Sequence, residues 1–370
     1  MNDQGFPIIE YKATDSYFDW GVQHGEEYKS GIKELISIRK ELMLAKNPSI
    51  KNHLDELANA QWNETQKFAP HLIEELKGIY IGADVSLTDI TILNNYTDFR
   101  DLSLPEEGCS TIHVQNDQEV YSGQTWDMHG SAKKYVSLVK VPSRDGLPAS
   151  VNFSLVGCVG MMGVNSEGCL VGVNNINTKN AKAGIIWPVL VRKLLTLKSL
   201  KEIKSQLINA PVTSGHNYIV SSIMGGAHIE VTPHEHDIVS SVIPGDTTSI
   251  FHTNHCLGEN VTKVEDQTAM SSTTHIRFDI LTKKTKDITS FDQLHSLLTD
   301  HENHPKSICS HFESGAQDPS CTCGGGVADL SKDKDAFCLF WRGCQEYDNN
   351  YKEYKFKISK STNDFELLSQ

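Results

Sequence analysis

The chain has 370 residues, a formal net charge of −13 and a sequence pI of about 5.6. Hydrophobic residues make up 38% and charged residues 22%, which is ordinary for a globular protein with a full core. The acidic balance excludes a surface built to bind nucleic-acid phosphates. No apolar run approaches the roughly 20 residues of a membrane span. We therefore expect neither nucleic acid nor a membrane as a partner.

The N-terminal stretch lacks the basic flank and apolar run of a signal peptide. The nine cysteines are an odd number, and unpaired thiols are the rule in reducing compartments. We expect a cytoplasmic protein with free cysteines.

The first hundred residues predict helices. Apolar residues recur at helical spacing between positions 35 and 42 and again between positions 72 and 79. Ser86 opens the stretch "SLTD", which is typical of a helix N-cap, and the helix should run toward Leu93. The run "DLSLPEEG" then ends this region.

After Cys109 the apolar residues recur with period two, which predicts short strands separated by turns. Strands are expected in "STIHV", "EVYSGQTWD", "YVSLVKV" and "VNFSLVG", and in the glycine-punctuated stretch "VGMMGVNSEGCLVGVNN". Further strands are expected at about 217–223, 227–232, 236–243, 249–253, 324–330, 336–342 and 352–358. Helices are expected around 190–197, 200–207, 271–282 and 290–298. Strand blocks interrupted by helix pairs indicate an α+β fold, with helices on both faces of mainly antiparallel sheets.

The composition changes at Gly108–Cys109, the place where a processing boundary would fall. Gly108 has no side chain, so its carbonyl is open to attack by the Cys109 thiol. A hairpin folded around 116–119 would return Asp127 to about the level of Cys109. After cleavage Cys109 would carry a free α-amine, whose usual pKa of about 7.7–8.0 suits it as the base for its own thiol. Asp127 would then orient that amine.

The motif "GCST", followed 18 residues later by the Asp of "GQTWD", resembles the penicillin acyltransferase family. These are self-cleaving N-terminal-nucleophile hydrolases, and choloylglycine hydrolases are more distant kin. Further matches follow the family's order, namely "GVQHGEEYKSGI", "GVNSEGCLVGVNN", "HTNHCL", "SSTTHIRFDIL" and "HPKSIC". The resemblance implies a four-layer α/β/β/α fold. It also implies a helical segment 1–108 released by autocleavage and a catalytic segment 109–370, which remain together as one compact heterodimer.

The resemblance also implies a set of site residues. Cys109 would be the nucleophile, Asp127 the group near its amine, and Asn174 and Asn254 the helpers of the tetrahedral intermediate. Side-chain amides suit that last role because they donate hydrogen bonds to an oxyanion without titrating. Substrate contacts are expected from Gln124, Trp126, Arg277 and Ser307. Arg277 matches one arginine of the family's pattern, whereas Thr274 and Ser310 stand where arginines are expected.

The predicted function is an amide hydrolase or acyltransferase that works through a thioester at Cys109. Its substrate would be a small N-acyl amine or amino acid derivative, with an acyl-CoA or an amine acceptor as a further partner and no cofactor. Two alternatives stay open. One is a papain-like cysteine protease using Cys109, Asn254 and either His252 or His255. The other is an unprocessed, non-catalytic binding protein of the same fold.

A zinc site is a separate alternative. The side chains that could supply it are Cys321, Cys323, Cys338, Cys344 and His311. The spacings C-x-C and C-x5-C are not those of paired zinc knuckles, and small residues packed on a sheet face account for them. We therefore expect no metal.

Overall fold

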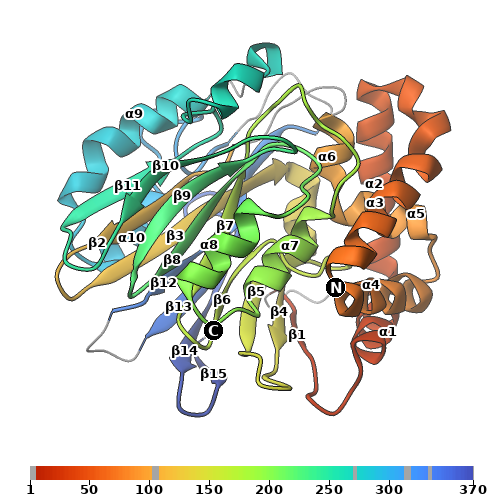
Figure 1. Ribbon diagram of the computed structural model, residues 1–370, viewed down its shortest axis with the longest axis horizontal. Helices are drawn as coiled ribbons and strands as arrows, with labels where there is room; N and C mark the ends of the chain where they lie inside the picture. Colours follow the sequence, from red (N-terminus) through yellow and green to blue (C-terminus); the bar gives the residue numbers. More distant parts are fainter. Residues whose placement is uncertain (1–5, 102–107, 270–272, 312–317, 332–335, 370) are drawn as a thin grey trace.

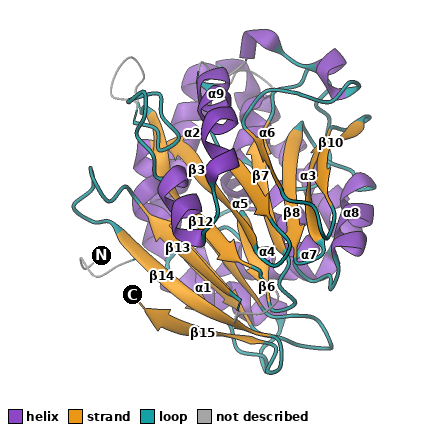
Figure 2. Ribbon diagram, turned by 90° about the vertical axis from the view of Figure 1, so that its left-hand side faces the viewer, coloured by secondary structure: helices purple, strands orange, loops and turns teal. Residues whose placement is uncertain are grey.

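The computed structural model describes residues 6–101, 108–269, 273–311, 318–331 and 336–369. Two β-sheets lie face to face, and helices cover both outer sides (Figures 1 and 2). This confirms the predicted α+β fold with four α/β/β/α layers. The run just before Gly108 and the first two residues of "SSTTHIRFDIL" lie outside the described residues.

The first sheet has eight strands. In spatial order they are β1 (Ile8–Glu10), β4 (Val136–Val141), β5 (Ser150–Leu155), β6 (Met162–Asn165), β7 (Leu170–Asn175), β8 (His216–Ser222), β9 (Gly225–Val231) and β10 (His236–Val242). Only β1 pairs in parallel, with β4. Nearly every residue of β4 to β9 is buried, because the helices cover one face and the second sheet covers the other.

The second sheet has seven strands, all antiparallel. In spatial order they are β11 (Thr248–His252), β2 (Thr111–Gln115), β3 (Val120–His129), β12 (Ser320–Asp329), β13 (Phe337–Arg342), β14 (Lys352–Ser359) and β15 (Asp364–Ser369). The turn between β2 and β3 falls at 116–119, as predicted. There the Asn116 side chain accepts a hydrogen bond from the Glu119 backbone N–H at 2.9 Å.

Helices of the N-terminal region and the middle of the chain pack on the eight-stranded sheet. They are α1 (Tyr17–Glu27), α2 (Lys29–Lys46), α3 (Leu54–Phe68), α4 (Pro70–Ala83), α5 (Leu87–Asn94), α6 (Tyr96–Asp101), α7 (Trp187–Leu194) and α8 (Leu200–Ile208). On the opposite side, α9 (Thr274–Lys284) and α10 (Phe291–Leu298) cover the seven-stranded sheet. Both helices are labelled in Figure 1, and α9 is seen in front of the sheet in Figure 2. None of the described helices is long and apolar enough to cross a bilayer.

One apolar core joins the part of the chain before Gly108 to the part after it. The same buried cluster contains Leu76 of α4, Leu93 of α5 and Phe153 of β5. An ion pair of 3.0 Å between Glu75 and Arg192, both buried, links α4 to α7. The site described next therefore rests on a single folded unit.

Candidate active site

Cys109 lies two residues before the start of β2, and its backbone is held on both sides. Its N–H donates to Asn254 Oδ1 at 2.8 Å. Its carbonyl oxygen accepts from Arg277 Nη1 at 2.6 Å. The residue is buried at the junction of β2, the loop after β11 and helix α9. The backbone of Cys109 is thus held by side chains from two distant segments.

The β2–β3 hairpin brings Asp127 next to Gly108. Thr111 pairs with Gln124, and the Thr125 N–H donates to the Ser110 carbonyl at 3.0 Å. If the same register is continued, Asp127 lies opposite Gly108. This is one residue from Cys109, the predicted position. A β-carbon placed on Gly108 would come within 2.8 Å of Asp127 Oδ2. The backbone at the predicted cleavage site is therefore in close contact with a buried carboxylate.

Thr322 fixes the carboxylate of Asp127. The Thr322 hydroxyl donates to Asp127 Oδ1 at 2.7 Å and accepts from the Ser310 N–H at 2.8 Å. Strand β12 thereby connects Asp127 to the loop that carries Ser310. No local pattern singles out Thr322, because its contact with Asp127 depends on the pairing of β3 with β12.

Arg277 is fully buried in α9 and binds several groups at once. Besides the Cys109 carbonyl, it donates to Ser110 Oγ at 3.0 Å and to Asn254 Oδ1 at 2.7 Å. Burial lowers the pKa of Arg277, while the neighbouring Asp127 and Cys109 act to raise it. Its guanidinium thus brings positive charge beside the thiol and the carboxylate.

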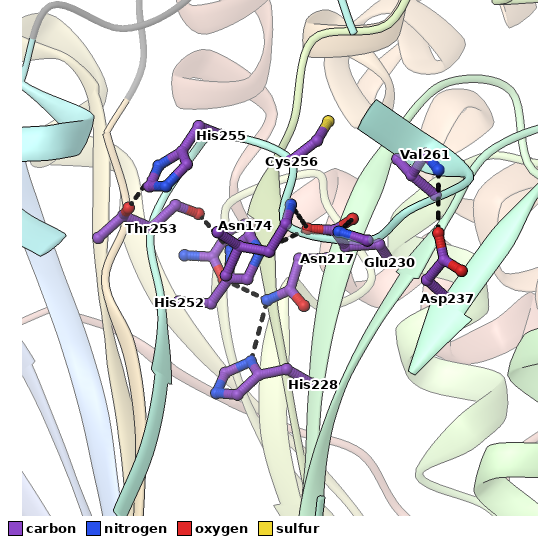
Figure 3. A network of polar contacts seen from close by, with 12 residues as sticks. Asn174, Asn217, His228, Glu230, Asp237, His252, Thr253, His255, Cys256 and Val261 are labelled. Carbon is purple, nitrogen blue, oxygen red and sulfur yellow. Dashed lines mark hydrogen bonds and ion pairs between the residues drawn. The ribbon is translucent and has the colours of Figure 1, made fainter. Parts of the chain in front are cut away.

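The loop that carries Asn254 is anchored from both ends. The Asn254 N–H donates to Thr274 Oγ1 at 2.8 Å, and Asn254 Nδ2 donates to the Asn175 carbonyl at 2.9 Å. Glu230, buried in β9, accepts from His252 Nε2 at 2.8 Å and from the Leu257 N–H at 2.6 Å (Figure 3). Thr274, a departure from the family's pattern, therefore helps to position Asn254.

Asn174 lies on β7, and two donors fix its amide. Thr111 Oγ1 donates to Asn174 Oδ1 at 2.7 Å. Asn217 Nδ2 donates to the same oxygen at 2.8 Å (Figure 3). Asn174 Nδ2 is buried and has no hydrogen-bond partner among the described residues. Asn217 in turn contacts His228 Nδ1 at 3.1 Å, and burial holds the pKa of His228 well below its usual value. The Asn174 amide thus keeps one unused donor inside the protein.

Three other predicted residues are engaged within the protein. Gln124 Oε1 accepts from the Val173 N–H at 2.7 Å, and Gln124 Nε2 donates to the Val173 carbonyl at 3.2 Å. Trp126 packs against Phe153 with 5.9 Å between ring centroids. The Ser307 hydroxyl donates to the Cys309 carbonyl. Their expected contacts with substrate stay predictions.

The histidines of "HTNH" are not arranged as a papain-type base. One ring nitrogen of His252, Nε2, contacts Glu230. The other, Nδ1, lies 2.8 Å from the Thr253 carbonyl oxygen. His255 contacts Thr274 Oγ1 at 2.9 Å, and burial lowers its pKa to about 3. Cys109 also leads into strand β2, which starts two residues later, whereas papain-type cysteines start a helix. The geometry speaks against this alternative.

Sequence and structure comparisons relate the chain to known proteins. Residues 114–320, more than half of the chain, match the family described as acyl-coenzyme A:6-aminopenicillanic acid acyl-transferase. The acyl-coenzyme A:6-aminopenicillanic-acid-acyltransferase 40 kDa form of Emericella nidulans is 24% identical over 307 residues, covering 80% of this chain and 82% of that protein.

Solved structures show weaker similarity. The conjugated bile acid hydrolase from Clostridium perfringens has a TM-score of 0.42 at 11% identity, over 71% of this chain and 97% of its own. The N-acylethanolamine-hydrolyzing acid amidase ortholog of Caenorhabditis elegans has a TM-score of 0.37 at 12% identity, over 59% and 92%. The penicillin V acylase from Agrobacterium tumefaciens has a TM-score of 0.36 at 13% identity, over 67% and 91%.

Proposed function

Because this chain belongs to the acyl-coenzyme A:6-aminopenicillanic acid acyl-transferase family, we propose that it is a self-cleaving amide hydrolase or acyltransferase with Cys109 as its nucleophile. The observation that carries the proposal is the environment of the Gly108–Cys109 bond. The Cys109 N–H is held by Asn254, and the Asp127 carboxylate lies against Gly108.

The first reaction is self-cleavage. The Cys109 sulfur attacks the Gly108 carbonyl carbon, the thiol proton passes to the departing amide nitrogen, and a thioester replaces the peptide bond. Water then hydrolyses the thioester, leaving a carboxylate on Gly108 and both a free thiol and a free α-amine on Cys109. Arg277 donates to the Cys109 carbonyl and keeps the backbone in place during this rearrangement.

The second reaction uses the new α-amine as the base for the Cys109 thiol. Asn254 Oδ1, which accepts from this nitrogen as an amide, accepts from it equally as an amine. Asp127 supplies the opposing negative charge. The thiolate attacks the carbonyl of a small N-acyl amine or amino acid derivative. The C–N bond of the tetrahedral intermediate then breaks, the α-ammonium returns its proton to the leaving amine, and an acyl thioester remains on Cys109. Water completes hydrolysis, whereas an acceptor amine completes acyl transfer.

We assign the oxyanion contact to Asn174 and the amine contact to Asn254. Asn174 Nδ2 retains a donor, whereas Asn254 Nδ2 donates to the Asn175 carbonyl. This division changes the sequence-based expectation, in which both asparagines stabilise the tetrahedral intermediate. A hydrogen bond from Asn174 Nδ2 to the substrate oxygen would raise the reaction rate, because negative charge develops on that oxygen only in the transition state.

Intact mass and N-terminal sequencing of the purified protein test the proposal. We expect two chains, 1–108 and 109–370, that separate under denaturing conditions and stay together under native ones, since the core cluster contains both. Cys109→Ala should leave one uncut chain without amidase activity, and Cys109→Ser should cleave slowly. Cys169→Ala, which removes a buried cysteine outside this site, is the control and should cleave normally.

An active protein whose peptide bond at Gly108–Cys109 stays intact would refute the scheme. An intact and inactive chain would favour the non-catalytic binding protein. A panel of N-acyl amides, offered with and without acceptor amines, then distinguishes hydrolysis from transfer.

A further inference from the structure

Four side chains with metal-binding chemistry converge away from Cys109. They are His301, Cys309, His311 and Cys344, and one ligand atom from each lies within 4.8 Å of the other three. His301, Cys309 and His311 belong to the chain between α10 and β12, whereas Cys344 follows β13. His301 is half-buried, and the other three are buried. The cluster therefore joins two loops inside the protein.

Three of the six distances between these atoms match a tetrahedral shell, and all six are within 4.8 Å. His301 Nε2 and His311 Nε2 are 3.3 Å apart. Cys309 Sγ lies 3.5 Å from His311 Nε2, and Cys344 Sγ lies 3.2 Å from His301 Nε2. A tetrahedral Zn²⁺ with its usual bond lengths separates two nitrogens by about 3.3 Å and a nitrogen from a sulfur by about 3.6 Å. All three measured edges lie within a few tenths of an ångström of those values.

The surroundings orient these groups as a second shell of ligands would. His301 Nδ1 lies 3.1 Å from Glu346 Oε2, so the carboxylate accepts from Nδ1–H and the Nε2 lone pair faces the centre. The Cys344 N–H donates to Asp348 Oδ2 at 2.7 Å, which fixes the backbone that carries this thiol.

We propose that His301, Cys309, His311 and Cys344 bind one Zn²⁺ ion as a closed structural site. Two thiolates and two imidazoles fill all four positions of zinc and balance its charge, leaving no position for substrate. The soft sulfur ligands select zinc over magnesium or calcium. Binding releases the two thiol protons and adds its free energy to folding.

The site would support the loop behind Asp127. Ser310 stands between two of the ligands, and its N–H donates to the Thr322 hydroxyl that holds Asp127. An ion at the cluster would fix this loop without touching the reacting atoms. The ligand spacing, H-x7-C-x-H followed by a distant cysteine, differs from the set considered from the sequence. Of that set, only His311 and Cys344 belong to the cluster.

Elemental analysis of the purified full chain, combined with cobalt substitution, tests the proposal. We expect about one zinc ion per chain, as one complete four-ligand shell requires. The Co²⁺ form should show the visible bands of tetrahedral cobalt and a thiolate charge-transfer band. Cys309→Ser and Cys344→Ser should lose most of the zinc. Cys321→Ser and His304→Gln, which alter nearby residues outside the four, should keep it.

Thiol labelling of the unaltered protein covers the case in which the variants do not fold. With zinc bound, Cys309 and Cys344 should resist alkylation, and a chelator should expose both and lower the melting temperature. Native protein with both thiols reduced and no bound metal would overturn the proposal. So would a disulfide between Cys309 and Cys344, or full zinc retention by both serine variants.

Discussion

Gly108 lies between two ionic side chains that leave no room for a β-carbon. Such a carbon would be 2.8 Å from Asp127 Oδ2 and 2.9 Å from Arg277 Nη2. Neither side chain can move freely, because Thr322 holds the carboxylate and the Cys109 carbonyl holds the guanidinium. The glycine is therefore required by its surroundings as well as by the chemistry proposed for its carbonyl.

We predict that Gly108→Ala slows self-cleavage. Forcing a methyl group into a filled site costs about 1–3 kcal/mol, which slows the reaction roughly 5-fold to 160-fold if the cleavage transition state carries the cost. A time course of fragment appearance on a denaturing gel measures the rate. Gly130→Ala is the control, because its nearest atom would be 3.3 Å away. Equal rates for Gly108→Ala and the unaltered chain would contradict the crowding argument.

We predict that Asn174→Ala lowers kcat. Loss of one oxyanion donor typically costs about 10²–10³ in kcat, whereas substrate binding changes little because the charge is absent from the ground state. Steady-state kinetics on the best amide of the panel give kcat and KM separately. Asn209→Ala, at an exposed helix end, should behave as the unaltered enzyme. A kcat unchanged by Asn174→Ala would remove this residue from the proposed site.

At the scale of the element, local sequence signals located most helices and strands. Ser86 accepts a hydrogen bond from the N–H three residues on, at the helix start predicted from its capping pattern. Ser199 and Ser290 do the same at the starts of α8 and α10, close to the predicted ranges. β1 and β15 were missed. β1 has three residues and pairs with β4, more than a hundred positions away, so no local pattern marks it.

The candidate site was predictable only in part, for a similar reason. Cys109, Asp127 and Asn254 stood out through motif order and hairpin symmetry, and the structure brings them together. Thr322 and Asn217 stand in ordinary strand sequence, so nothing before strand pairing marks them. The Cys and His cluster likewise depends on two loops meeting, which spacing along the chain does not reveal.

Helices α1 and α4 cross at glycines, and this contact gives a prediction at the same scale. A β-carbon on Gly78 would collide with the backbone of Phe18 and Val22, so the helices could not keep their approach. We predict that Gly78→Ala lowers the free energy of unfolding by about 1–3 kcal/mol, as overpacking does. Urea unfolding followed by circular dichroism measures it. Ile81→Ala, on the same helix, is the control: Ile81 is 48% exposed, so its loss should change the free energy of unfolding little. The prediction would be contradicted if Gly78→Ala and the unaltered protein had the same free energy of unfolding.

At the scale of the whole molecule, ionisable groups are buried where the part of the chain before Gly108 packs against the part after it. His24 of α1 accepts from the Gly157 N–H at Nε2 (2.8 Å), while its Nδ1 lies 3.1 Å from the Tyr11 hydroxyl. Tyr11 donates its own proton to Glu75, so Nδ1–H must be the donor to Tyr11. The ring is thus held neutral. Burial, helped by the charge of Arg192, lowers the pKa of His24 to about 3.

This arrangement predicts that stability falls as the pH drops. The unfolded chain binds a proton at His24 near pH 6.5, whereas the native state does so only near pH 3, so the free energy of unfolding decreases between these values. Burial lowers the pKa of His216 to about 4, which adds to the effect. Between about pH 7 and about pH 5, one such histidine accounts for roughly 2 kcal/mol. His24→Gln should reduce the loss by that amount in urea unfolding, whereas the exposed His234→Gln should not. An unchanged pH dependence in His24→Gln would mean that the native state accepts the proton after all.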